Sequence, residues 1–157
     1  MAIETFDDDI WYFAYGSNMN WDQKEDRTGA IREARIARLL GYRFAFNKRG
    51  KDAGQVYANV MNDEEAVTWG VIYRCRPAAI ELLDRHEGVR IGHYRRTTMA
   101  VLVGEEEVEA VVYVAEPKYI VEDSKPSDDY LGRILAGARL HELPDEYVRR
   151  IETIAGR

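Results

Sequence analysis

Residues 10–19 read IWYFAYGSNM, an apolar and aromatic run that stops at a glycine. Such a run is typical of a strand buried on both faces, so we expect a central strand at Ile10–Tyr15. Downstream, Asn20 can cap a short helix while Gln23 reaches back as the other half of a capping box, and Gly29 ends that helix. The chain is therefore predicted to begin with a strand, a tight loop and a helix.

The rest of the chain alternates between short strand-like runs and amphipathic helical stretches. Polar turns join two pairs of strands into predicted hairpins, one on each side of a helix at Pro77–His86. So many consecutive strands argue against a doubly wound parallel sheet. We therefore predict an α+β fold whose curved mixed or antiparallel sheet can close into a barrel. The expected strands are 34–40, 42–47, 56–60, 67–74, 93–103 and 108–115, with a loop at 48–54, turns at 62–65 and 104–107, and helices at 127–141 and 145–155.

The chain length of 157 residues fits one domain, because domains usually hold about 100 to 150 residues. Neither a linker-like composition nor an internal repeat divides the sequence. Asp7, Asp8 and Asp9 stand side by side before the first strand, and three adjacent carboxylates are costly to bury. We therefore expect a solvated acidic tail at residues 1–9 and a single domain at residues 10–157.

The composition argues against several classes of function. The 28 acidic and 22 basic residues give a net charge of -6, the opposite of the basic footprint that nucleic-acid binding needs. Cys75 is the only cysteine and the three histidines share no ligand spacing, so no metal site is predicted. No run approaches the roughly 18 apolar residues of a membrane span, and the start does not resemble a signal peptide. We expect a cytoplasmic protein that binds neither nucleic acid nor membranes.

The loop Tyr15–Met19 is a candidate anion-binding site. Its backbone N–H groups belong to neither the strand nor the helix, so they can converge on a ligand such as a carboxylate. Gly16 permits close approach of the backbone, while Ser17 and Asn18 add side-chain donors. The glycine patterns of dinucleotide-binding and phosphate-binding loops are absent. An ordinary turn followed by a helix cap is the alternative interpretation.

Glu87 is the candidate acid/base. It follows Ile80 by seven residues and Leu83 by four, which places it on the face that the helix buries. Burial and the negative end of the helix dipole both disfavour the ionised form, so both raise the pKa of Glu87 toward the range of a general base. The alternatives are a frayed helix end that leaves Glu87 in water, or a structural ion pair with Arg85, Arg90, Arg95 or Arg96.

Two motifs occur in a fixed order along the chain: Phe13–Met19 (FAYGSNM), and Leu83–Val89 (LDRHEGV) followed by Tyr94. Together with Trp69–Val71 and Pro126–Tyr130, they resemble the γ-glutamylcyclotransferase superfamily, which includes the γ-glutamylamine cyclotransferases and the plant AIG2-like proteins. The resemblance spans nearly the whole chain. Two motifs in the right order are more specific than either motif alone.

The resemblance implies a small mixed β-barrel with flanking helices, and an enzyme that uses no cofactor. Such an enzyme cyclises the γ-glutamyl group of a small-molecule substrate to 5-oxoproline and releases an amine or amino acid. Glu87 would be its acid/base. Met19 stands where the family usually has leucine, a conservative apolar change. The implied substrate-binding residues are Tyr15, Gly16, Ser17, Asn18, Met19, Tyr94 and Tyr130.

Several alternatives stay open. The same fold could bind a small ligand or a protein partner without turnover. The released group could instead come from γ-glutamyl-ε-lysine, another γ-glutamylamine or a γ-glutamylated biosynthetic intermediate. Sequence does not separate these substrates, because the leaving-group pocket would be formed by loops at 48–54 and 119–126, whose conformation it does not predict. A homodimer is also left open.

Overall fold

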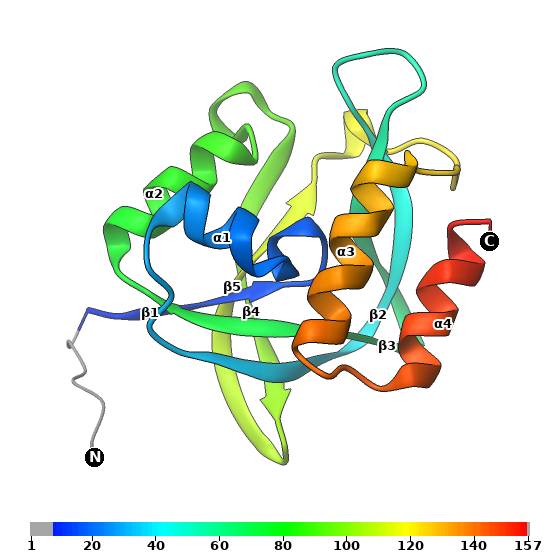
Figure 1. Cartoon of the computed structure of the whole chain (residues 1–157). Coiled ribbons are helices and arrows are strands. Elements are labelled where there is room, and N and C mark those ends of the chain that lie inside the picture. The colour runs from blue at the N-terminus through cyan, green and yellow to red at the C-terminus, as the bar shows by residue number, and fades with distance from the viewer. Residues whose placement is uncertain (1–7, 157) are drawn as a thin grey trace.

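The computed structural model describes residues 8–156, which form a closed five-stranded barrel flanked by four α-helices (Figure 1). The strand order is β1-β3-β2-β4-β5. Neighbours are antiparallel except at the closing contact, where Tyr12 of β1 pairs in parallel with Val111 of β5. The predicted mixed α+β barrel is therefore confirmed. The strands are β1 Ile10–Ala14, β2 Ala34–Arg49, β3 Val56–Cys75, β4 Tyr94–Val103 and β5 Glu106–Ala115.

β2 and β3 are each one long strand where the sequence predicted two short ones. Both halves of β3 pair with β2, and the ladder between them skips residues 63–66 of β3 opposite Gly41 of β2. The polar residues expected to turn the chain at 62–65 are instead an exposed bulge in a strand that continues. The predicted hairpin between 56–60 and 67–74 is therefore wrong.

β2 also extends farther than predicted. The loop expected at 48–54 begins only after Arg49, because Lys48 and Arg49 pair with β3. Lys48 thus belongs to the sheet, and only 3% of it is exposed. This shift of two residues changes the chemistry of the cavity described below.

The second hairpin and the helices are confirmed within a few residues. β4 and β5 are antiparallel neighbours. Asn20 caps the first helix as predicted, since its Oδ1 accepts a hydrogen bond from the Gln23 N–H at 3.0 Å. No helix within residues 8–156 is both long enough and apolar enough to cross a membrane. The helices are α1 Trp21–Thr28, α2 Pro77–His86, α3 Asp128–Leu140 and α4 Asp145–Ile154, with 3₁₀ turns η1 Ser17–Met19, η2 Val89–Ile91 and η3 Pro117–Tyr119.

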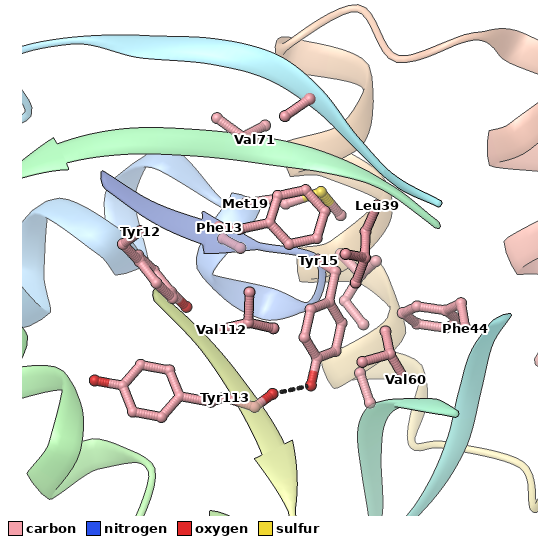
Figure 2. Packing of buried hydrophobic residues seen from close by; sticks show 14 of the residues in the cluster. Tyr12, Phe13, Tyr15, Met19, Leu39, Phe44, Val60, Val71, Val112 and Tyr113 are labelled. Carbon is pink, nitrogen blue, oxygen red and sulfur yellow. Dashed lines mark hydrogen bonds between the residues drawn. The ribbon is translucent and has the colours of Figure 1, made fainter. Parts of the chain in front are cut away.

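The helices cover the barrel in two pairs (Figure 1). α1 lies beside α2, whereas α3 packs against η1 and α4, and α4 also contacts β2. The apolar core lies between the strands and beneath α3; Figure 2 shows Phe13 and Tyr15 of the β1 segment packed among residues of β2, β3 and β5. The Tyr15 hydroxyl donates to the Tyr113 carbonyl at 2.6 Å across this core (Figure 2). The start of the chain's first loop is therefore anchored from inside the barrel.

The predicted acidic tail is only partly within the described residues, since residues 1–7 lie outside them. Asp8 is exposed, as expected. Asp9 is not solvated: its carboxylate pairs with Arg32 at 2.6 Å, and its other oxygen lies 4.0 Å from Arg74. The prediction is wrong at Asp9, because two arginines brought in by the fold neutralise the carboxylate beside β1.

Candidate active site

After β1 the chain turns through Gly16 into the single 3₁₀ turn η1, Ser17–Met19. A turn this short carries no periodic signal, so the sequence did not reveal it. The Met19 N–H donates to the Gly16 carbonyl at 3.0 Å. The backbone N–H groups of Ser17 and Asn18 donate to no main-chain carbonyl within residues 8–156. Of the N–H groups in the predicted anion site, these two can therefore donate to a ligand.

Gln23 holds the side chains of this loop. Its Nε2 donates to Ser17 Oγ at 2.7 Å and to Asn18 Oδ1 at 2.9 Å. The predicted capping box is therefore only half right: Asn20 caps α1, but Gln23 does not reach back to it. The reason is η1, which brings the side chains of Ser17 and Asn18 over the first turn of α1 and within reach of Gln23.

Asn18 links the loop to Glu87. Its Oδ1 also accepts a hydrogen bond from Arg27 at 3.0 Å. Because the Asn18 oxygen faces these two donors, Gln23 and Arg27, the NH₂ group of Asn18 faces the opposite way. Asn18 Nδ2 accordingly donates to the Tyr12 hydroxyl at 3.0 Å and lies 3.4 Å from Glu87 Oε1. The orientation of this buried amide is thus fixed, and it presents a donor to the candidate acid/base.

Glu87 follows the last residue of α2 as its C-cap, and its N–H donates to the Leu83 carbonyl at 2.8 Å. Gly88 continues with φ of 64°, a left-handed conformation that turns the chain away and aims Glu87 at the cavity. Burial of the carboxyl raises the pKa of Glu87 to about 7, and the positive charges of Arg27 and Lys48 offset part of that rise. The predicted rise in the pKa is confirmed, with burial as its largest cause.

The structural ion pair considered for Glu87 is not found. Among residues 8–156, no arginine or lysine nitrogen lies within 4.0 Å of its carboxylate, and the nearby Arg96 pairs with Asp84 at 3.1 Å instead. The residue is partly accessible, through the cavity. A carboxyl that is largely buried, lines a cavity and has no salt bridge can gain and lose a proton near neutral pH.

The predicted tyrosines form one wall of the cavity around Ala58. The Tyr94 hydroxyl donates to the Ala58 carbonyl at 2.8 Å, and the Ala58 N–H donates to the Tyr130 hydroxyl at 3.0 Å. Burial raises the pKa of both phenols, so both stay protonated. Because Tyr130 accepts from Ala58, its own proton is available to a ligand, whereas the protons of Tyr94 and Tyr15 are already used.

Met19 is the one predicted site residue that the structure does not bring to the cavity. Its side chain is fully buried beside Phe13 in the core (Figure 2). Gly137 of α3 packs on its backbone so closely that a Cβ there would lie 2.3 Å from the Met19 carbonyl carbon. Met19 therefore positions the loop, and does not contact a ligand in the cavity.

A cavity of about 460 Å³ unites the remaining predicted residues. Glu87, Tyr15, Tyr94 and Tyr130 line it together with Gly16, Ser17 and Asn18. Of the two loops expected to form a leaving-group pocket, the one at 48–54 contributes Lys48, Gly50, Lys51 and Asp52 to the lining, while none of residues 119–126 lines it. Among the lining residues that the sequence did not single out are Arg27, His93 and Arg133. Only Arg27 had a usable signal, because it follows Gln23 by four residues on one face of α1.

The cavity is positively charged, in contrast to the whole chain. Basic side chains outnumber acidic ones, so the site suits an anionic ligand. Within residues 8–156, no three His, Cys, Asp or Glu side chains are grouped so as to hold a metal ion. The basic lining residues are Arg27, Lys48, Lys51, Arg85 and Arg133, and the acidic ones are Asp52 and Glu87.

Comparison with known proteins agrees with this fold. Residues 67–151, more than half of the chain, match the AIG2-like family, and the chain belongs to that family. Gamma-glutamylcyclotransferase from Mus musculus is 29% identical over 147 residues, which cover 91% of this chain and 77% of that protein. The Homo sapiens gamma-glutamylcyclotransferase is 28% identical with the same coverage. A solved structure of a gamma-glutamyl cyclotransferase superposes with a TM-score of 0.80 at 27% identity, covering 92% of this chain and 86% of that one.

Proposed function

We propose that this chain is a γ-glutamylcyclotransferase-type enzyme, which cyclises the γ-glutamyl group of a small substrate to 5-oxoproline. The observation that carries the proposal is the carboxyl of Glu87, which is aimed into a basic cavity with its pKa raised to about 7. The relatives named above support it, because their similarity to this chain extends over about nine-tenths of its length.

Glu87 acts as the base and then as the acid. Its carboxylate accepts a proton from the α-ammonium group of the substrate, and the freed amine attacks the γ-carbonyl carbon, which becomes a tetrahedral centre with an oxyanion. Attack leaves two protons on the ring nitrogen. When the oxyanion collapses, the bond to the released nitrogen breaks and Glu87 gives its proton to that nitrogen. The surplus proton of the ring nitrogen then passes through the Glu87 carboxylate to the released amine, which leaves as an ammonium ion. The products are 5-oxoproline and the amine, and no atom is gained or lost.

The loop binds and orients the substrate. The amides of Ser17 and Asn18 can donate to an anionic oxygen, either the α-carboxylate or the developing oxyanion, and Arg27, which is bonded to Asn18, adds positive charge. Tyr130 supplies a phenolic proton that its bond to Ala58 leaves available. Because the ring closes within one molecule, holding the substrate folded provides a large part of the rate acceleration.

The test is release of 5-oxoproline from γ-glutamyl-alanine, glutathione and γ-glutamyl-ε-lysine, with Glu87→Gln as the matched variant. Release by the wild type that requires Glu87 would support the proposal, and the preferred substrate would identify the released amine. A folded wild-type protein that binds these compounds without turnover would contradict it and favour a ligand-binding module instead.

A further inference from the structure

Lys48 places a buried ammonium group in the wall of the cavity. It lies near the end of β2, opposite Tyr57 of β3, and only 3% of the residue is exposed. The Nζ atom lies 5.8, 5.2 and 4.9 Å from the ring centres of Tyr57, Tyr94 and Tyr119. These rings hold the lysine in place and exclude water from it, but they supply no formal negative charge.

The hydrogen-bonding partner of this ammonium group is His93, whose Nδ1 lies 2.6 Å from Nζ. Burial and the adjacent cations lower the pKa of His93, so it is neutral and Nδ1 accepts the bond. The imidazole is fixed in turn by stacking on Tyr119, with ring centres 4.1 Å apart. Histidine therefore aims the ammonium group without neutralising it.

Lys48 lacks a carboxylate partner. Among residues 8–156, no Asp or Glu oxygen lies within 4.0 Å of its Nζ. Burial lowers the pKa of Lys48 to about 8, a change that Glu87 partly offsets from across the cavity. A buried cation without a counterion is unfavourable, and an anion that enters the cavity would relieve this cost.

Arg27 and Lys48, the two cations whose charges act on Glu87, lie on different sides of the cavity. Arg27 reaches from α1 and is bonded to Asn18, on the side of the loop amides. Lys48 reaches from β2, close to the turn at residues 50–55 that projects beyond α2 and α3 (Figure 1). Both charges act on the Glu87 carboxyl, which therefore lies within electrostatic reach of each. A substrate with an anionic group at each end would match this arrangement.

We propose that Lys48, presented by His93, binds a carboxylate on the amine that the reaction releases, and so selects γ-glutamyl conjugates of amino acids or peptides over those of neutral amines. This inference rests on the proposed cyclotransferase function and assigns to one residue the choice of leaving group. The glutamyl end remains with the loop amides and Arg27.

The test compares γ-glutamyl-L-alanine with γ-glutamyl-L-alaninamide, which differ in the charge of the leaving group. The values of kcat/KM are measured for both compounds in the wild type and in Lys48→Met, and the ratio of acid to amide is calculated for each protein. Comparing this ratio between the two proteins cancels the intrinsic difference in reactivity of the compounds. We expect the variant to lose at least about 10-fold of the preference for the acid, the effect of one hydrogen bond to a charged group. Turnover of the amide should fall less than turnover of the acid, because Lys48 acts on the amide only through the positive charge that it adds near Glu87.

Two further variants make the test specific. Lys118→Met removes an exposed charge that also lies over the Tyr119 ring, at 5.3 Å, and should leave the ratio unchanged. Lys48→Gln removes the charge but keeps a donor for His93, and should lower the ratio as Lys48→Met does; it serves if the methionine variant does not fold.

An unchanged ratio in folded Lys48 variants would overturn the inference, and so would an equal loss for both compounds, since that would place Lys48 at the glutamyl end. If the wild type released no 5-oxoproline from either compound, the proposed function would fail. Calorimetric binding of the two compounds to wild type and Lys48→Gln would then decide the role of Lys48 separately.

Discussion

Glu87 controls the pH dependence expected of the reaction. Because burial raises the pKa of its carboxyl to about 7, the basic form is the minor one in acid solution. We predict that kcat/KM falls tenfold per pH unit below about 7 and is level just above it. The measurement is a pH profile of 5-oxoproline release. Asp52→Asn, which removes an exposed carboxylate at the mouth, should keep the acid limb; an acid limb centred near 4.5 would contradict the role of Glu87.

The same carboxyl should weaken the fold in neutral solution. Its pKa is higher in the folded chain, at about 7, than its ordinary value of 4.5, so the folded form binds the proton more tightly. The folded chain therefore loses stability as pH rises from about 4.5 to 7, by up to about 3 kcal/mol.

Glu87→Gln removes this cost. We predict that urea unfolding shows the variant more stable than wild type by up to about 3 kcal/mol at pH 8, with a much smaller difference at pH 4. An equal difference at both pH values would show that the glutamine acts through packing alone.

At the level of elements, the contact between α3 and η1 sets the position of the loop. A Cβ on Gly137 would lie 2.3 Å from the carbonyl carbon of Met19 and 2.5 Å from the Asn20 nitrogen, both of which are backbone atoms. We predict that Gly137→Ala lowers the free energy of unfolding by about 1 to 3 kcal/mol and reduces activity, because α3 must move away from the loop.

Gly132 provides the matched control on the same helix. It is exposed, and a Cβ there would meet no atom within 4 Å. Gly132→Ala should therefore stabilise the chain by about 0.5 to 1 kcal/mol through helix propensity alone. Equal effects of the two substitutions in urea unfolding would contradict the tight contact.

The sequence predicted correctly those elements whose structure depends on local residues alone. The buried strand at Ile10, the capped helix after Asn20 and the helix ending at Glu87 depend on local residues, and all three were found. The course of β3 depends on its partner. Residues 62–65 have the composition of a turn, yet pairing of both flanking halves with β2 keeps the strand extended through them.

The same difference between local and non-local structure explains which residues of the site the sequence identified. Glu87 and the loop at Gly16 were found because helix phase and a short motif mark them. Lys48 was expected at the start of a loop beside the leaving-group pocket, because a lysine close to glycines is typical of a surface loop. Only the pairing of β2 with β3, and the packing of His93 over it, make it a buried residue of the cavity.

For the whole molecule, closure of the barrel buries the single thiol, Cys75, at the end of β3. Burial also raises the pKa of this thiol, which lowers its thiolate fraction. We predict that a disulfide reagent labels Cys75 in native buffer at least about 100-fold more slowly than in urea, because labelling then requires opening of the barrel. Rapid labelling of native protein would contradict this closed arrangement.

Closure also assembles the site, since η1, β2, the end of α2 and α3 each contribute a residue to one cavity. The central claim is that Glu87 transfers the proton there. The most direct measurement is 5-oxoproline release from γ-glutamyl-alanine at pH 8 by wild type and Glu87→Gln, both shown to be folded by circular dichroism. The account predicts turnover by the wild type and a loss of about 10²- to 10⁴-fold in the variant. A folded Glu87→Gln with near wild-type turnover would contradict it.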